Sequence, residues 1–517
     1  MPITSATPIS GAALGRTYAL TTVAACALMA CGLSGCVVGP DFKQPASPGV
    51  ESLVPGSLKP PTGEGGLAQR FASGRDIPGD WWRLFRSTAL NGLVERAIAG
   101  NADLQSAQAA VRIAQANVEA QRGAFFPLIG ANYNPVRQKV SLDPLVPSTP
   151  NASPYYTTIT AQLSVSFVPD VFGGIRRQVE TLEATAENQR FQLEATYLTL
   201  TANLSVAAIQ EASLRGQIAA TRRLVTIAKD LLELQRKALA LGQVSALDVA
   251  TQEAALAQVE ATLPPLEKSL AVARDQMIAL TGQLPGESQL AKFEFSSFSL
   301  PSDLPLSLPS SIVRQRPDVR AAEANMHGAT AAVGVSIANR LPQFTLSGNA
   351  GSVSSAFANV VNFSTPFSFW TIAGNASQVL FDGFTLEQKQ RAAEAGLDQA
   401  ASQYKSAVVT AFQNVADALQ ALNYDARTLN AAMLGERAAD KALKLTKEQL
   451  RLGQVSSLQV LNAQQTYLQA SLAVVQAKAA RYSDTVALFQ ALGGGWWNRA
   501  DIEADDKGGS WIAAIVK

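Results

Sequence analysis

The residues able to carry covalent chemistry lie near the N-terminus of this 517-residue sequence. All three cysteines, Cys26, Cys31 and Cys36, fall in the first 36 residues, and His327 is the only histidine. Leu33-Ser34-Gly35-Cys36 matches the bacterial lipoprotein box, in which small residues admit a peptidase and the cysteine thiol accepts a diacylglycerol. We therefore predict that Cys36 is a lipidation site. The alternative is an ordinary signal peptide with an incidental cysteine.

Residues 1–35 have the layout of a lipoprotein signal peptide. A single charge, Arg16, precedes an apolar stretch from about residue 18 to residue 30, which is short for a membrane span. Two or three acyl chains on Cys36 would anchor the mature chain, since each buried methylene contributes roughly 0.8 kcal/mol. Val37 stands where an aspartate commonly retains lipoproteins at the inner membrane, so outer-membrane lipid is the expected partner.

Composition argues against several classes of function. The chain has 42 basic and 41 acidic residues, and this balance does not supply the basic surface that nucleic-acid binding needs. Cleavage before Cys36 leaves no free thiol, and a lone histidine is more often structural than catalytic. We expect no enzyme, no cofactor and no metal. The enzyme alternative would need a cluster of carboxylates that sequence cannot reveal.

Two halves of the chain repeat one another. Leu241-Gly-Gln-Val-Ser-Ala-Leu-Asp-Val249 reappears as Leu452-Gly-Gln-Val-Ser-Ser-Leu-Gln-Val460, and Asn101-Ala-Asp-Leu104 aligns with Arg316-Pro-Asp-Val319. So long a period excludes the short solenoid repeats. We expect five parts: the signal peptide (1–35), a lipid-anchored extended segment (36–86), a first repeat (87–300), a second repeat (301–495) and a C-terminal tail (496–517).

Each repeat is predicted to contain a helix, a β-hairpin and a long helical hairpin, the last over 174–282 and 384–492. Proline is absent from 170 to 263 and from 367 to the end, and apolar residues recur there at spacings of three, four or seven. Helices of about 65 residues cannot form a compact core and need partners along their length. Pro264-Pro265 should break the returning helix of the first hairpin only. Glycine and serine of each Gly-Gln-Val-Ser turn should end one helix and cap the next.

The predicted β-hairpins span 126–168 and 343–381. Residues 159–167 and 344–350 alternate apolar and polar side chains, whereas 129–133 and 367–381 do so less regularly. Such segments are typical of transmembrane strands. Four strands cannot close a barrel in lipid, so several copies should pool their strands, with 144–154 and 352–366 as external loops. The alternative is a pair of half-buried hairpins in a soluble domain.

Several stretches resemble the outer-membrane efflux protein family, the TolC-like outer membrane factors, in its lipoprotein branch. They are Cys36-Val-Val-Gly-Pro-Asp-Phe-Lys-Gln-Pro45, Trp81-Trp82-Arg-Leu-Phe85, Gln315-Arg-Pro-Asp-Val-Arg320, Leu380-Phe-Asp-Gly383 and Ala491-Leu-Gly-Gly-Gly-Trp496. The resemblance implies a mainly α fold with a small transmembrane β part. In it, a homotrimer shares twelve strands in an outer-membrane β-barrel, and the helical hairpins form a periplasmic barrel.

The resemblance also implies the function of a passive exit duct for small molecules such as drugs. Its partners would be a periplasmic adaptor and an inner-membrane transporter of the resistance-nodulation-division type. The adaptor would contact the two turns, which consist of Gly242, Gln243, Val244, Ser245, Gly453, Gln454, Val455 and Ser456. These residues could equally be capped turns with no contact role.

The resemblance further suggests where the channel narrows. Several family members place aspartates on the helix after the second turn, where this chain has Gln459 and Asn462, so an acidic ring is in doubt. Asp248 either adds acidity to the constriction or only stabilises a helix N-terminus. The main alternative to a channel is a lipid-anchored periplasmic scaffold of coiled coils without a pore. The cargo is not identified by the sequence.

Overall fold

The computed structural model describes residues 37–46, 49, 69–139, 153–286, 290–306, 309–361 and 367–499. Cys36, the predicted signal peptide, most of the predicted loop 144–154 and the tail beyond 499 lie outside these ranges. The chain forms two compact units. Unit 1 contains residues up to 44, 112–187 and 324–402, and unit 2 contains 45–111, 188–323 and 403–517. Each unit takes segments from both repeats, so the repeats are not separate domains.

Helices make up most of the described chain. The first repeat contains α2 (Thr88–Gly100), α3 (Ala102–Arg122), α4 (Gly174–Ala240), α5 (Ala246–Glu260) and α6 (Leu263–Leu280). The second contains α7 (Pro309–Gln315), α8 (Pro317–Ala338), the short α9 (Phe357–Val361), α10 (Thr385–Arg451) and α11 (Ser457–Ala491). None of these described helices is both long and apolar enough to cross a membrane.

The long helices follow the proline-free stretches. Helices α4 and α10 have 67 residues each, and their apolar seam is buried at Leu204, Ala411 and Val415 among others. Pro264 and Pro265 lie in the first turn of α6, directly after the break that separates it from α5. Proline is tolerated there because the first helical N–H groups have no partner within the helix. Helix α11 has no proline and continues unbroken for 35 residues.

The single helix expected before each β-hairpin is wrong, because the structure has two helices there. The breaks lie at Asn101 and Arg316, the residues that align between the repeats. The Asn101 side chain accepts a hydrogen bond from the Leu104 amide at 2.9 Å, which caps α3. The side-chain amide of Asn101 also donates to the Leu280 carbonyl at the end of α6 (3.0 Å). In the same way, the Arg316 side chain donates to the Ala491 carbonyl at the end of α11 (2.9 Å). Both side chains therefore satisfy a carbonyl at a helix C-terminus.

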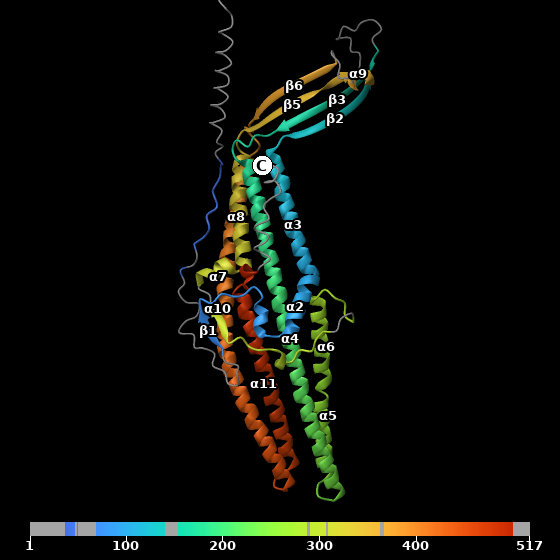
Figure 1. The fold of residues 1–517 in the computed structure, drawn as a ribbon, viewed down its shortest axis with the longest axis vertical. Coiled ribbons are helices and arrows are strands. Elements are labelled where there is room, and N and C mark those ends of the chain that lie inside the picture. The colour runs from blue at the N-terminus through green and yellow to red at the C-terminus, as the bar shows by residue number, and fades with distance from the viewer. Residues whose placement is uncertain are drawn as a thin grey trace, which may run out of the picture. The chain divides into compact units, whose positions relative to one another are not determined.

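Four strands of unit 1 form one antiparallel sheet in the order β2-β3-β5-β6 (Figure 1). They are β2 (Leu128–Lys139), β3 (Tyr155–Phe167), β5 (Gln343–Ser354) and β6 (Ser368–Ser377). The hairpins of the two repeats meet where β3 pairs with β5, for example Leu163 with Ala350. Pro135 lies in β2, an edge strand of this four-stranded sheet, and edge strands are where proline is tolerated because some of their N–H groups do not face the neighbouring strand.

Two predicted segments differ from the structure. The segment 36–86 is not extended throughout, since β1 (Arg70–Ser73) pairs in parallel with β4 (Asp303–Leu306) and Trp81–Phe85 form a 3-10 helix. The reason is burial: Trp81 stacks on Phe489 with ring centroids 5.4 Å apart, and both side chains are inaccessible to solvent. In the expected loop 352–366, β5 continues to Ser354 and α9 follows; residues 362–366 lie outside the described chain.

Candidate functional site

The candidate site consists of the two turns of unit 2 that join α4 to α5 and α10 to α11 (Figure 1). Gly242 and Gly453 have φ angles of 71° and 72°, in the left-handed region that glycine adopts without strain. In the first turn the Gln243 amide donates to the Ala238 carbonyl and the Gly242 amide to the Leu239 carbonyl, both at 2.9 Å. The second turn repeats this pattern at Gly453 and Gln454. Each long helix thus ends in a Schellman motif.

The two turns differ at the start of the next helix. Ser245 and Asp248 form a capping box, in which the Asp248 amide donates to the Ser245 hydroxyl and the Ser245 amide donates to the Asp248 carboxylate (3.1 Å). Ser456 is the N-cap of α11 by position and backbone angles, as expected, but its side chain makes no capping hydrogen bond. Gln459 takes the position equivalent to Asp248, and the reciprocal carboxylate of the first turn is therefore missing.

Asp248 also joins the two turns to each other. Its Oδ1 atom accepts a hydrogen bond from the Ser457 hydroxyl at 3.0 Å, while Oδ2 accepts from Ser245 at 2.7 Å. The hydroxyl and amide of Ser245, followed by Ser457, lower the pKa of Asp248 below its ordinary value because they stabilise the carboxylate. Asp248 therefore stabilises a helix N-terminus and also contacts the second turn, 209 residues away.

A groove of about 860 Å³ separates the turns. It is lined by residues of both, including Gln243, Val244, Asp248, Val455 and Ser457. The four leucines that flank the turns are largely exposed: Leu241, Leu247, Leu452 and Leu458. A partly apolar groove beside exposed leucines is a surface suited to contact with another protein.

The predicted constriction residues Gln459 and Asn462 lie in the first two turns of α11, and both are exposed. With Thr466 they form a polar stripe at helical spacing. The Asp248 carboxylate contacts Ser457, which precedes Gln459 by two residues at the start of α11.

Sequence reasoning missed two glutamines buried above the turns. Gln235 of α4 and Gln464 of α11 are 4% and 2% exposed, and the side-chain amide nitrogen of each makes no hydrogen bond within the described chain. Gln464 lies on the buried face of α11 with Val460 and Tyr467. These two residues form an apolar core with Leu231, Ala439 and Leu443 between α4, α10 and α11. The available signal was spacing, since both glutamines stand at positions that continue an apolar seam.

Among the described residues no group of histidine, cysteine, aspartate and glutamate could hold a metal ion. His327 stacks on Phe42 with ring centroids 4.4 Å apart and contacts Glu180 at 2.9 Å. His327 therefore packs against Phe42 and pairs with Glu180 inside unit 1.

The sequence profile of the outer membrane efflux protein family matches residues 93–283 and 308–494. The chain belongs to this family. It is 30% identical over 435 residues to the pyoverdine export outer membrane protein OpmQ of Pseudomonas aeruginosa, covering 82% of this chain and 90% of that one. The probable efflux pump outer membrane protein TtgC of Pseudomonas putida is 26% identical over 470 residues, covering 90% and 94%.

Solved structures agree with this assignment. The outer-membrane channel OprN superposes with a TM-score of 0.80 at 26% identity, covering 89% of this chain and all of that one. The predicted family, the mainly helical fold with few strands and the two-fold repeat are thereby confirmed. The protein is an outer-membrane efflux channel, and its family is one of transport proteins.

Proposed function

We propose that the protein works as a homotrimeric exit duct, lipid-anchored at Cys36, in a tripartite efflux system. The observation that carries the trimer is the sheet of unit 1. Among the described residues, its edge strands β2 and β6 have no second partner strand, and nearly all their residues are exposed, in contrast to the central strands β3 and β5. Open edges in lipid leave backbone groups unpaired, and pairing β2 of one copy with β6 of the next removes both edges.

The turns are the proposed docking site for a periplasmic adaptor, which would connect the duct to an inner-membrane transporter of the resistance-nodulation-division type. The groove between the turns and the exposed leucines beside it support this role. Gly242, Gln243, Val244 and Ser245, with Gly453, Gln454, Val455 and Ser456, would form the contact. Adaptor binding would open the channel if the adaptor binds the open packing more tightly than the resting one.

The proposed constriction uses the exposed amides of α11. Three copies would bring six side chains, from Gln459 and Asn462, near a common axis, where they could hydrogen-bond to one another. The hydrogen bond from Ser457 to Asp248 would hold the two hairpins of each copy together. The cargo is proposed to be small molecules, in line with the pyoverdine export that the name of the relative OpmQ gives for that protein. Selection would lie with the transporter.

Conductance tests the constriction. Gln459→Ala and Asn462→Ala should each raise the resting conductance of the purified protein in planar bilayers and the vancomycin sensitivity of cells. Gln469→Ala, an exposed amide further along α11, is the matched control and should change neither. Unchanged conductance in both test variants would contradict the constriction.

The trimer is tested separately by heat-modifiable migration in gels, and a stable monomer in detergent would refute it.

A further inference from the structure

The first described residues of the chain are held closely against unit 1. We call residues 37–42 the N-terminal strap. The Val38 amide donates to the Phe172 carbonyl at 3.2 Å, in the loop between β3 and α4. A Cβ atom on Gly39 would come within 2.4 Å of the Gly334 Cα atom, and one on Gly173 within 2.9 Å of the Val37 Cα atom. Backbone approaches this close leave no room for side chains, so the position of the strap is closely defined.

Polar contacts hold the other end of the strap. The Arg177 side chain, only 4% exposed, donates to the Asp41 carboxylate at 2.6 Å, to Glu180 at 2.7 Å and to the Val38 carbonyl at 3.2 Å. Glu180 also contacts His327, whose ring stacks on Phe42. A buried arginine with several hydrogen-bonded partners is a strong and directional attachment. The strap therefore determines where the chain enters unit 1.

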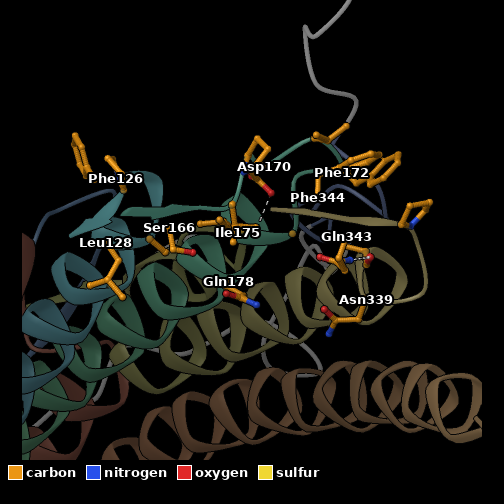
Figure 2. A pocket seen from close by; sticks show the side chains of 18 of the residues that line it. Phe126, Leu128, Ser166, Asp170, Phe172, Ile175, Gln178, Asn339, Gln343 and Phe344 are labelled. Atoms are coloured by element: carbon orange, nitrogen blue, oxygen red, sulfur yellow. Dashed lines mark hydrogen bonds between the residues drawn. The ribbon is translucent and has the colours of Figure 1, made fainter. Parts of the chain in front are cut away.

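A cavity of about 560 Å³ lies beside this attachment, also in unit 1 (Figure 2). It is lined by the ends of β2, β3 and β5 and by the start of α4, with the apolar side chains of Phe126, Leu128, Val168, Phe172, Ile175 and Phe344. Of these, Phe126 and Leu128 are 67% and 75% exposed. Exposed aromatic and aliphatic side chains around a hollow indicate a site for an apolar ligand.

Three of the polar lining residues, Asp170, Gln178 and Gln343, make hydrogen bonds within the protein. Asp170 accepts hydrogen bonds from the amides of Ile175 and Arg176, at 2.9 and 3.0 Å. Gln343 donates to the Ala338 carbonyl at 3.0 Å, and Gln178 accepts from Gln121 at 2.7 Å. Because these three side chains already have partners, a ligand need not supply hydrogen bonds to them. A hydrocarbon chain meets that requirement.

We propose that the cavity holds an acyl chain carried by Cys36. Val37 contacts Gly173, which stands between the lining residues Phe172 and Gly174. Cys36 is covalently bonded to Val37, and one peptide unit separates neighbouring Cα atoms by about 3.8 Å, so an acyl chain on its thiol or amine would start within reach of the cavity. A tethered ligand binds as an intramolecular partner at high effective concentration. The inference rests on the proposed lipidation and adds that one chain binds protein instead of membrane.

Cysteine accessibility tests the proposal, since the mature chain has no cysteine other than the acylated one. Ile175→Cys would be made in the full chain and in a non-acylated form with Cys36→Ser and an ordinary secretory signal. In outer-membrane vesicles, a water-soluble maleimide should label Ile175→Cys about tenfold more slowly in the acylated form. Gln388→Cys, exposed in the same unit, should react equally in both forms. Equal rates at residue 175 would overturn the proposal, because the acyl chain would then give no protection. Slow labelling in both forms would show that membrane lipid or a neighbouring copy covers the cavity.

A second measurement does not depend on the variants. Cells fed a photoreactive fatty acid would make the unaltered protein, and ultraviolet light should crosslink the acyl group of Cys36 to peptides containing Phe172, Ile175 or Phe344. Crosslinks to phospholipid alone would refute the cavity as the site while leaving lipidation intact. Mass spectrometry of the N-terminal peptide distinguishes the two failures, because an unmodified Cys36 refutes the lipidation as well.

Discussion

Unit 2 contains two regions that are packed in opposite ways. In the aromatic junction, formed by Trp81, Phe85, Tyr482 and Phe489, each ring centroid lies within 6.5 Å of at least one other in stacked, edge or tilted contacts, and all four side chains are buried. At the turns the leucines are exposed, and Gln235 and Gln464 are buried with amide nitrogens that make no hydrogen bond in the described chain. The junction fixes the helices, whereas the packing above the turns can be rearranged at little cost.

The largest effect is expected at the junction. Phe489→Ala removes a fully buried ring that contacts Trp81 and Phe85, and it should lower the free energy of unfolding by about 3–5 kcal/mol. Thermal unfolding of the detergent-solubilised protein measures this. Leu458→Ala, at an exposed leucine beside the second turn, should change stability by less than about 0.5 kcal/mol. Equal losses in the two variants would remove the contrast between the regions.

Arg316 provides the next largest effect. Arg316→Ala leaves the Ala491 carbonyl without its donor and Asp318 without the arginine that pairs with it at 2.6 Å, so we expect a loss of about 2–3 kcal/mol. Arg316→Lys should restore only part of this, because lysine lacks the planar fork of donors. Arg451→Ala breaks an exposed pair with Glu448 and should cost at most about 0.5 kcal/mol. If Arg316→Ala cost as little as Arg451→Ala, the end of α11 would not need the hydrogen bond from Arg316 to the Ala491 carbonyl.

The buried glutamines should respond in the opposite direction. Gln235→Leu removes an amide whose two polar atoms lack partners in the described chain, and it should stabilise the packing above the turns by about 1 kcal/mol. If opening separates these helices, the variant should also show rarer openings in planar bilayers. Gln252→Leu is the matched control, since Gln252 is equally buried but donates to the Ala228 carbonyl at 3.3 Å. It should be destabilising. A loss of stability in both variants would mean that the amide of Gln235 has a partner.

These contrasts show how much could be predicted from sequence. The long helices are predicted by the absence of proline, and the turns are predicted by Gly242 and Gly453, whose positive φ in the structure suits glycine. Both signals depend on local chemistry. The breaks at Asn101 and Arg316 were missed although local signals exist, since Asn101 caps α3 and Pro317 begins α8. The hydrogen bonds from the same two side chains to Leu280 and Ala491 depend on residues far along the chain. The bond from Ser457 to Asp248 was out of reach for the same reason. Local signals predict the helices and turns, whereas contacts between distant parts of the chain determine which helix end each polar side chain hydrogen-bonds to.

The smallest effect concerns Asp425 and Asp484, a carboxyl pair close to the junction. It sharpens the comparison, because burying this pair lowers the stability of a well-packed region at neutral pH. Burial, followed by the hydrogen bond and charge of Asp484, raises the pKa of Asp425 from 3.8 to about 7, and the charge of buried Arg481 offsets this in part. The folded protein then binds this proton more tightly than the unfolded chain does. The stability it contributes is complete below about pH 4 and is lost as the pH rises to about 7.

Asp425→Asn tests this sign, because the amide imitates the protonated acid at every pH. Unfolding midpoints measured between pH 5 and pH 8 should fall less steeply with pH in the variant than in the wild type. At pH 8 the variant should be more stable by about 1 kcal/mol, after allowance for solvent screening of a half-buried pair. Asp398→Asn, at an exposed carboxylate of the same helix, should leave the pH dependence as it is. A variant less stable than the wild type at pH 8 would mean that Arg481 needs the charge of Asp425 and that the junction gains from the ionised pair.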